Sequence, residues 1–240
     1  MGTQGTFGYI IGKKKRFMYV QFDADLLWSI LTREIYVLMK HYKTTESLKE
    51  IFEKIKSTKG EPKETDDIKY AMFTDFDSKN KNTNKWYALL RYCQGSYINI
   101  LEAGHIINEK EEHGLTFIID FNKGIVVFYN KDTQGKKEIH NIAKIEDIME
   151  FEEMPTKSYT EIITEMREDF NTWYESFTKI QKELEKLYKL KQDARAQGNM
   201  NIEEKINKYI DNAIWEEKKL NMERKVFYKR IKSLDLIDES

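Results

Sequence analysis

A heptad pattern over residues 159–187 restricts the fold of this chain more than any other feature. Apolar residues recur there at alternating intervals of four and three positions: Tyr159, Ile163, Met166, Phe170, Trp173, Phe177, Ile180, Leu184 and Leu187. This spacing places them on one stripe of a long helix, as in coiled coils. We therefore expect a helix that continues to Gln197 and stops at Gly198.

A second helix is predicted directly after this glycine. Asn201, with Glu204 three positions later, has the spacing of a helix N-cap and its capping-box partner. Apolar residues then continue at helical spacing, interrupted by Glu217 and Arg224: Ile202, Ile206, Tyr209, Ala213, Leu220, Phe227, Ile231 and Leu234. Because the connection is only a few residues long, the two helices must run antiparallel. Residues 156–240 are thus predicted to form an antiparallel helical hairpin.

The charges of this hairpin are balanced, with 17 Lys or Arg and 17 Asp or Glu residues interspersed over residues 156–240. Such a mixture is typical of a solvent-exposed coiled coil. The hairpin could pack back onto its own domain, since its aromatic seam is broad. We favour an arm that binds a protein partner or dimerises, because its helices are too long for the preceding domain to cover. The residues predicted to bind the partner are Phe170, Trp173, Phe177, Trp215 and Phe227.

Residues 1–155 are predicted to form an α+β domain, which ends at Pro155. Two strand pairs are expected, residues 6–11 with 17–22 around a turn at 12–15, and residues 115–121 with 125–129 around Asn122-Lys123-Gly124. A further strand is expected at Tyr97–Leu101, whereas residues 86–93 fit a helical turn or a strand equally well. Between them, one helix is expected to be capped by Asp23 or Asp25, and another to start at Thr44 or Thr45.

Composition restricts the class of protein. Lys and Arg total 40 against 41 Asp and Glu, so the net charge of -1 argues against a protein that coats DNA. The single cysteine, Cys93, is typical of a reducing compartment, so we expect an intracellular, cytoplasmic protein. No cofactor is expected, because one cysteine and four scattered histidines build no zinc motif and no Gly-rich phosphate loop accompanies the acidic pairs. A ratio of 33 Lys to 7 Arg is typical of AT-rich genomes, such as those of large DNA viruses and of some bacteria and protists. For a virus, the compartment would be the host cytoplasm or the virion.

The sharpest basic cluster lies in the first predicted turn: Lys13, Lys14, Lys15 and Arg16. Lysine and arginine side chains contact phosphate backbones, and exposed aromatic side chains such as Trp86 stack on bases. The cluster therefore suggests contact with nucleic acid or a nucleotide. The alternative is an ordinary solvated hairpin tip.

Two further candidate sites follow from short patterns. Asp75 and Asp77 come after an apolar segment, where paired carboxylates can ligate Mg²⁺ in an enzyme. The start of a polar loop is the favoured interpretation of this pair, because no Gly-rich phosphate loop accompanies it. The opening Met1-Gly2-Thr3-Gln4-Gly5-Thr6 matches the pattern for myristoylation of Gly2. Membrane attachment is expected only if Gly2 is acylated.

Three short motifs stand near the N-terminus: Met1-Gly2-Thr3-Gln4-Gly5, Phe7-Gly8-Tyr9 and Tyr19-Val20-Gln21-Phe22-Asp23. They resemble an uncharacterised family of bacterial, phage and large-DNA-virus proteins. Its members begin M-G-T-R-G, continue through a strand pair and then show a motif like Y-N-H-F-D-S-Y-P, and residues 116–129 resemble the family's second strand pair. The resemblance implies a shared domain without a settled activity. Gln4 replaces the arginine and Val20-Gln21 replace Asn-His, so the best proton-transfer residue of that motif is absent.

These observations together favour a non-enzymatic interaction or scaffold subunit, potentially of a virus-encoded complex, with the helical hairpin as its binding or dimerisation arm. A factor that binds RNA or a nucleotide through Lys13–Arg16 is the first alternative. A Mg²⁺-dependent enzyme at Asp75 and Asp77 is the second.

Overall fold

The computed structural model describes residues 3–21, 23–58, 61–63, 66, 69–74, 86–106, 114–151 and 157–233, without the side chains of 87, 105, 106 and 225–233. Contacts divide these residues into two compact units. The first comprises the described residues up to Ile162 together with those from Arg230, and the second is Ile163–Lys229. The boundary predicted at Pro155 falls in residues 152–156, which lie outside the description.

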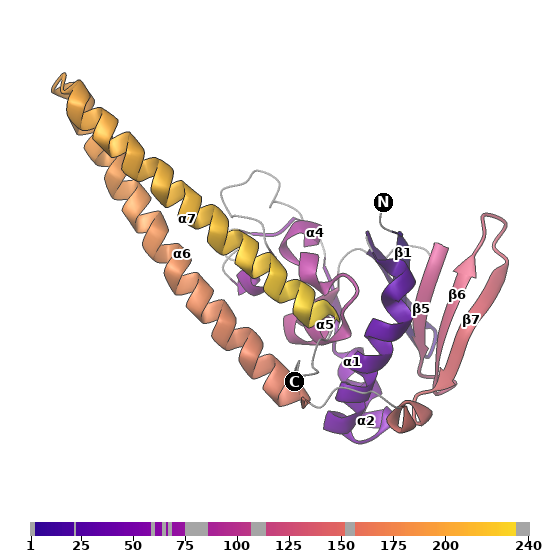
Figure 1. The fold of residues 1–240 in the computed structure, drawn as a ribbon. Helices are drawn as coiled ribbons and strands as arrows, with labels where there is room; N and C mark the ends of the chain where they lie inside the picture. The colour runs from indigo at the N-terminus through magenta and orange to yellow at the C-terminus, as the bar shows by residue number, and fades with distance from the viewer. Residues whose placement is uncertain are drawn as a thin grey trace. The chain divides into compact units, whose positions relative to one another are not determined.

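A five-stranded sheet forms the centre of the first unit (Figure 1). Its strands are β1 (Gly5–Ile11), β2 (Lys14–Val20), β5 (Gly114–Asp120), β6 (Ile125–Lys131) and β7 (Lys137–Lys144), in the order β2-β1-β5-β6-β7. The β1–β5 pair is parallel and the other three pairs are antiparallel. A separate two-residue bridge pairs β3 (Lys56–Ser57) with β4 (His105–Ile106). The predicted α+β class is confirmed.

Three helices provide the hydrophobic core against one face of this sheet: α1 (Leu27–Tyr42), α2 (Thr45–Glu53) and α5 (Tyr97–Ala103). Phe7 of β1 contacts Tyr97 of α5 at a ring distance of 5.3 Å, and Tyr9 contacts Phe52 of α2 at 5.1 Å. The Tyr97 hydroxyl donates to the Gly8 carbonyl at 2.6 Å, so this buried polar group is satisfied. Short helical segments complete the unit: η1 (Ala24–Leu26), η2 (Ala71–Phe73), α4 (Trp86–Leu89), η3 (Arg91–Cys93) and η4 (Asp147–Glu150).

Both predicted strand pairs are present, but the fifth strand is a different one from that expected. The strand is β7, whose side chains are almost all exposed. Its two isoleucines, Ile139 and Ile142, are three positions apart and so break the alternation that signals a strand. A bulge in the pairing with β6 brings them opposite Tyr129 and Val127, on one face.

The predicted strand at Tyr97–Leu101 is wrong, because this segment is helix α5. Four consecutive residues from Tyr97 to Ile100 are buried, so no period distinguishes a helix from a strand here. The Ser96 hydroxyl accepts from the Asn99 N–H at 3.1 Å, and Gly104 ends the helix in the left-handed conformation. A buried carboxylate from α1, that of Glu34, also accepts from the Tyr97 N–H.

The two predicted helix caps near the N-terminus have different outcomes. Thr44 caps α2, its hydroxyl accepting from the Ser47 N–H at 3.1 Å, as expected. Neither Asp23 nor Asp25 caps α1: Leu26 precedes that helix, and the Asp25 carboxylate instead accepts from the Thr3 hydroxyl. That bond holds the start of the described chain beside η1, so a tertiary contact has replaced the cap.

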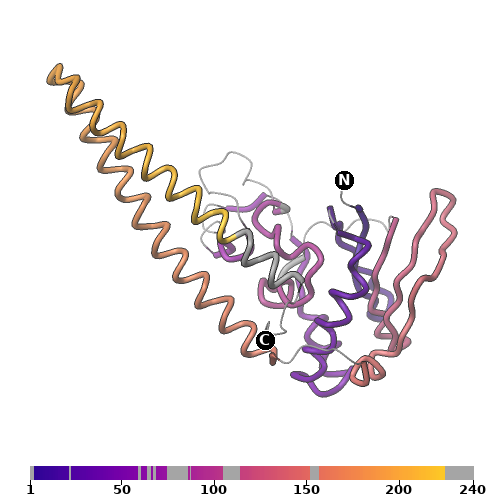
Figure 2. Tube along the Cα trace, viewed as in Figure 1, coloured from indigo at the N-terminus to yellow at the C-terminus, as the bar shows by residue number. Residues whose placement is uncertain are grey.

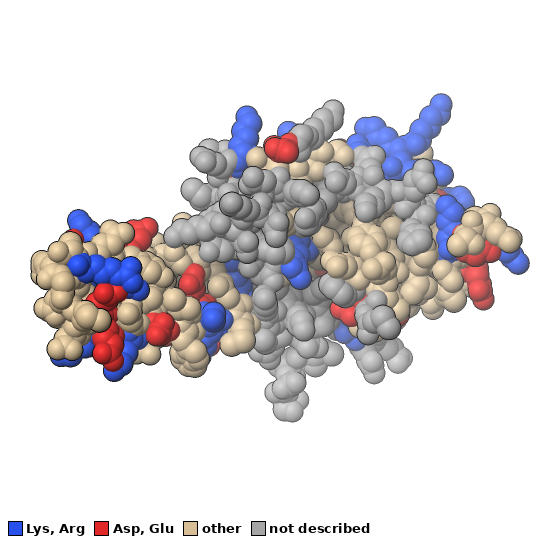
Figure 3. All heavy atoms as spheres, turned by 90° about the horizontal axis from the view of Figure 1, so that it is seen from above, with Lys and Arg blue, Asp and Glu red and all other residues tan. Residues whose placement is uncertain are grey.

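The second unit is formed by two long helices, α6 (Tyr159–Ala196) and α7 (Met200–Ser233), of which α6 begins in the first unit. Their traces run side by side along the hairpin (Figure 2). Gln181 contacts Glu217 and, nearer the turn, Arg195 contacts Glu203, so the helices are antiparallel, as predicted. On the face seen in Figure 3, acidic and basic side chains are interspersed over this hairpin.

The turn between α6 and α7 has a regular helix-ending geometry. Gly198 has φ 68°, its N–H donates to Arg195, and the Asn199 N–H donates to Ala194. This is a Schellman motif, which requires the positive φ that glycine adopts without strain. The cap of α7 is Asn199 rather than the predicted Asn201, its side chain accepting from the Ile202 N–H at 3.3 Å.

Buried residues of the hairpin core follow the predicted seam on α6 and depart from it on α7. Ile180 and Leu184 pack with Ile206, Ile210 and Ala213. The predicted seam residues Ile202 and Tyr209 are 46% and 61% exposed, and Ile210 lies in the core instead. On α7, Ile210 therefore takes the place of Tyr209 between the predicted seam residues Ile206 and Ala213.

Candidate functional site

A groove of about 670 Å³ lies between the β1–β2 hairpin and helix α2. Four basic side chains line it, Lys13, Lys14, Arg16 and Lys49, together with one carboxylate, that of Glu53. Its remaining lining includes apolar and aromatic side chains that belong to the core. We call this hollow the basic groove.

Strand pairing explains which residues of the predicted basic cluster reach the groove. Lys14 lies opposite Ile11 and Arg16 lies opposite Tyr9, so both point to the helix-covered face of the sheet. Lys15 lies opposite Ile10, on the other face, and does not line the groove. The sequence predicts one continuous basic cluster. Because successive side chains of a strand point to opposite faces of the sheet, the cluster is divided between the two faces.

Two of the basic side chains are held in position. The Arg16 guanidinium donates to the Ser57 hydroxyl at 3.2 Å. The Lys49 ammonium, with its side chain 26% exposed, contacts the Glu46 carboxylate at 2.8 Å, which raises the pKa of Lys49. Burial raises the pKa of Tyr9 to about 12, while the positive charge of nearby Arg16 acts in the opposite direction.

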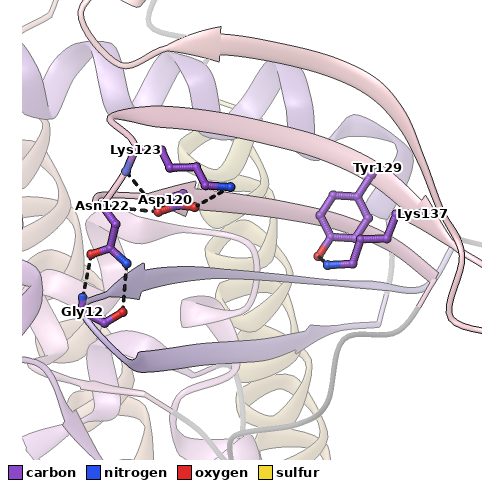
Figure 4. A network of polar contacts seen from close by, with 6 residues as sticks. All are labelled: Gly12, Asp120, Asn122, Lys123, Tyr129 and Lys137. Atoms are coloured by element: carbon purple, nitrogen blue, oxygen red, sulfur yellow. Dashed lines mark hydrogen bonds and ion pairs between the residues drawn. The ribbon is translucent and has the colours of Figure 1, made fainter.

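A side-chain clamp fixes the turn that carries Lys13 (Figure 4). The Asn122 side chain accepts from the Gly12 N–H at 2.7 Å and donates to the Gly12 carbonyl at 2.9 Å. Asn122 is itself oriented by Asp120, whose carboxylate accepts from the Asn122 N–H at 3.1 Å and the Lys123 N–H at 3.3 Å. Gly12 has φ 57°, as expected for the first residue of a tight hairpin turn.

Sequence reasoning missed Lys49 and Asn122 as members of this site. Lys49 lies on the polar side of an amphipathic helix, where lysine is common and does not indicate a site. Asn122 fits a hairpin turn, where asparagine is common, so it does not indicate a site either. Trp86, predicted to stack on bases beside the basic cluster, does not line the groove; its ring lies 5.5 Å from that of Tyr70. No local pattern indicates any of these placements, because each depends on elements far apart in the chain.

The predicted partner-binding aromatics of α6 lie inside the hairpin. Phe170, Trp173 and Phe177 are half-buried, and Trp173 stacks on Phe177 at 4.8 Å. The Arg224 guanidinium of α7 lies 3.9 Å from the Trp173 ring centroid and 5.5 Å from that of Phe170, in cation–π contact. Arg224, which interrupts the apolar seam in the sequence, therefore packs within it, and the role of these aromatics in partner binding stays a prediction.

Trp215 is the predicted partner-binding residue that the structure displays most openly. Its side chain is 64% exposed, and Met222, seven positions later, is 61% exposed. Trp215 lies two positions beyond buried Ala213, which places it about 200° around the helix from the seam. Trp215 and Met222 share a helix face, on which the exposed Lys218 and Lys219 lie between them.

Several predicted site residues lie outside the described residues. These are Gly2, Asp75 and Asp77, together with the side chain of Phe227. Within the part of the chain that the structure describes, no group of three or more His, Cys, Asp or Glu side chains could hold a metal ion. Among the same residues, no helix combines the length and apolar character needed to cross a bilayer.

Comparison with known proteins gives no match: no protein-family model, no curated protein and no solved structure is similar to this chain.

Proposed function

We propose that this protein is a non-enzymatic interaction subunit whose helical hairpin joins two copies of the chain. The observation that carries this proposal is the environment of Trp215 on α7. Asp211 lies four positions before it and Lys219 four positions after it. Both are exposed, and Lys219 also contacts Glu223 of its own helix at 3.8 Å. Residues four apart lie on the same side of a helix, so an acidic and a basic group flank the exposed indole.

This arrangement is self-complementary. If the α7 helices of two copies pair antiparallel about a two-fold axis at Trp215, Asp211 of each copy faces Lys219 of the other. The two indoles then lie at the centre of the contact. Large aromatic side chains at the centre, surrounded by charged pairs, are typical of protein interfaces.

The charge of the hairpin is compatible with self-association. Residues 156–240 carry equal numbers of acidic and basic residues, 17 of each, so two copies do not repel one another through net charge. A strongly acidic or basic partner would have favoured a hairpin of the opposite sign. The balance is therefore compatible with a second copy as the occupant of this face, and the positions of Asp211 and Lys219 carry the choice.

Size-exclusion chromatography with light scattering tests the proposal on the full chain. We expect a dimer for the unmodified protein and a monomer for Trp215→Gln, because the substitution removes the central apolar contact. Tyr209→Gln is a matched control, since Tyr209 is 61% exposed on the same helix but on another face. This control should remain dimeric.

A charge exchange tests the predicted orientation of the two helices. Asp211→Lys should weaken the dimer by about ten-fold, because two attractive pairs become repulsive ones. Combining it with Lys219→Asp should restore the affinity. A monomeric full chain, or a dimer that Trp215→Gln leaves intact, would contradict the proposal, and a monomer would direct the search to a different protein partner.

A further inference from the structure

We propose that the basic groove binds an oligophosphate, a small molecule that carries two or more linked phosphate groups. All residues that line this groove belong to the first unit, and none belongs to the α6–α7 hairpin. Neither proposal depends on the other. The argument rests on the charges, the rigidity and the lining of the groove.

Charge gives the first part of the argument. Three cations from the β1–β2 hairpin, Lys13, Lys14 and Arg16, line the groove with a fourth from helix α2, Lys49, and with the carboxylate of Glu53. The negative charges of Glu46 and Glu50 on α2 also act on Lys49, so the excess of positive charge comes mainly from the β1–β2 hairpin. Although Glu46 accepts one hydrogen bond from Lys49, an ammonium group has three donors, so two remain for a ligand. Cations from two elements around one hollow favour a ligand with several negative charges close together.

Rigidity gives the second part. Both backbone polar groups of Gly12 are bonded to the Asn122 side chain, so the turn next to Lys13 is tied to the β5–β6 turn (Figure 4). Arg16 is positioned by Ser57. Groups that are already in place lose less conformational entropy when a ligand binds, which improves affinity.

The lining of the groove distinguishes a small oligophosphate from a nucleic acid. Its volume of about 670 Å³ is within the range of small-molecule sites. Proteins that bind single-stranded nucleic acid provide exposed aromatic rings on which bases stack. The two aromatic residues that line this groove, Tyr9 and Phe52, are only 3% and 0% exposed, so neither offers a stacking surface.

Isothermal titration calorimetry of the full chain with inorganic tripolyphosphate tests the proposal. We expect one site per chain whose affinity falls as salt concentration rises. Lys14→Gln should weaken binding about three-fold, and Lys13→Gln, Lys14→Gln and Lys49→Gln together should weaken it by more than about ten-fold. Lys15→Gln is the matched control, because it removes the same charge from the same strand but on the face away from the groove.

Three outcomes would overturn the proposal. The first is the absence of tripolyphosphate binding at low salt. The second is an equal loss of affinity in Lys14→Gln and Lys15→Gln, which would indicate non-specific attraction by the hairpin tip. The third is tighter binding of a uridine-rich RNA oligonucleotide than of tripolyphosphate with the same dependence on Lys14, which would identify a nucleic-acid surface. Circular dichroism of each variant confirms that it is folded.

Discussion

Cys93 shows how the environment of one residue determines its chemistry. The thiol is 2% exposed and lies 3.5 Å from the Asn99 carbonyl oxygen. Burial raises the pKa of Cys93, and the negative charge of Glu34 raises it further. The thiolate is the reactive form of cysteine, so this side chain should be inert in the folded protein.

Thiol titration with a chromogenic disulfide checks this expectation. At pH 8 the folded chain should react negligibly over minutes, whereas the chain in urea should release one equivalent at once. An added thiol at an exposed position, Lys136→Cys, is the control and should react without denaturant. Rapid reaction of the unmodified folded chain would show that Cys93 is accessible.

Tyr9 makes stability depend on pH in the alkaline range. Its pKa is raised from 10.0 to about 12, mainly by burial. In the unfolded chain Tyr9 loses its proton near pH 10, before the folded form does, so deprotonation favours unfolding. The contribution of Tyr9 is thus fully present below pH 10 and is lost as the pH rises towards 12. Urea denaturation at pH 9, 10 and 11 measures the free energy of unfolding, which should fall more steeply with pH for the unmodified chain than for Tyr9→Phe. The same dependence on pH in both chains would contradict this account.

At the scale of the element, helix α5 depends on side chains outside its own apolar pattern. Glu34, fully buried on α1, accepts from the Ser96 hydroxyl at 2.6 Å and from the Ile98 N–H at 3.4 Å, as well as from the Tyr97 N–H. A carboxylate at a helix N-terminus satisfies N–H groups that have no partner within the helix and interacts well with the helix dipole. This interaction explains why α5 forms where sequence pattern favoured a strand.

Substitution of Glu34 tests this account. Glu34→Gln should lower the free energy of unfolding by about 1–3 kcal/mol, because an amide cannot accept all three hydrogen bonds and leaves buried donors unsatisfied. Glu50→Gln, at an exposed position on α2, should change it by less than about 0.5 kcal/mol. Urea denaturation measures both, and equal effects would show that Glu34 contributes no more than a surface residue.

At the scale of the whole molecule, the chain contains two compact units with separate hydrophobic cores. The hairpin core consists of residues of α6 and α7, including Ile180, Leu184 and Ile210. The core of the first unit lies between the sheet and α1, α2 and α5. We therefore expect that a destabilising substitution in one core leaves the other unit folded.

Hydrogen exchange can follow the two cores in one sample. Ile210→Asp places a charge in the hairpin core, so the amides of α7 should lose protection while those of α1 keep theirs. Tyr209→Asp introduces the same charge at the neighbouring, exposed position and should leave both helices protected. Loss of protection in both helices of Ile210→Asp would show that the units unfold together.

Elements that depend on local periodicity and on backbone requirements could be predicted from the sequence. The long helix α6, its end at Gly198 and the strand pair around Asn122-Lys123-Gly124 follow from patterns that neighbouring residues complete among themselves. The basic residues Lys13, Lys14 and Arg16 could be predicted as part of a site for the same reason, because they lie within four positions of one another. The antiparallel hairpin was expected because only a few residues connect the two helical patterns.

Features that depend on contacts between residues far apart in the chain could not be predicted from sequence patterns. Segment 97–103 became a helix because a carboxylate 63 positions away bonds to its first turn. The basic groove excludes Lys15 and includes Lys49 because strand pairing and the placement of α2 select which side chains converge. Periodicity indicates which residues of a helix or strand face the core. It does not indicate which residues of other elements contact them, and the candidate site is formed by such contacts.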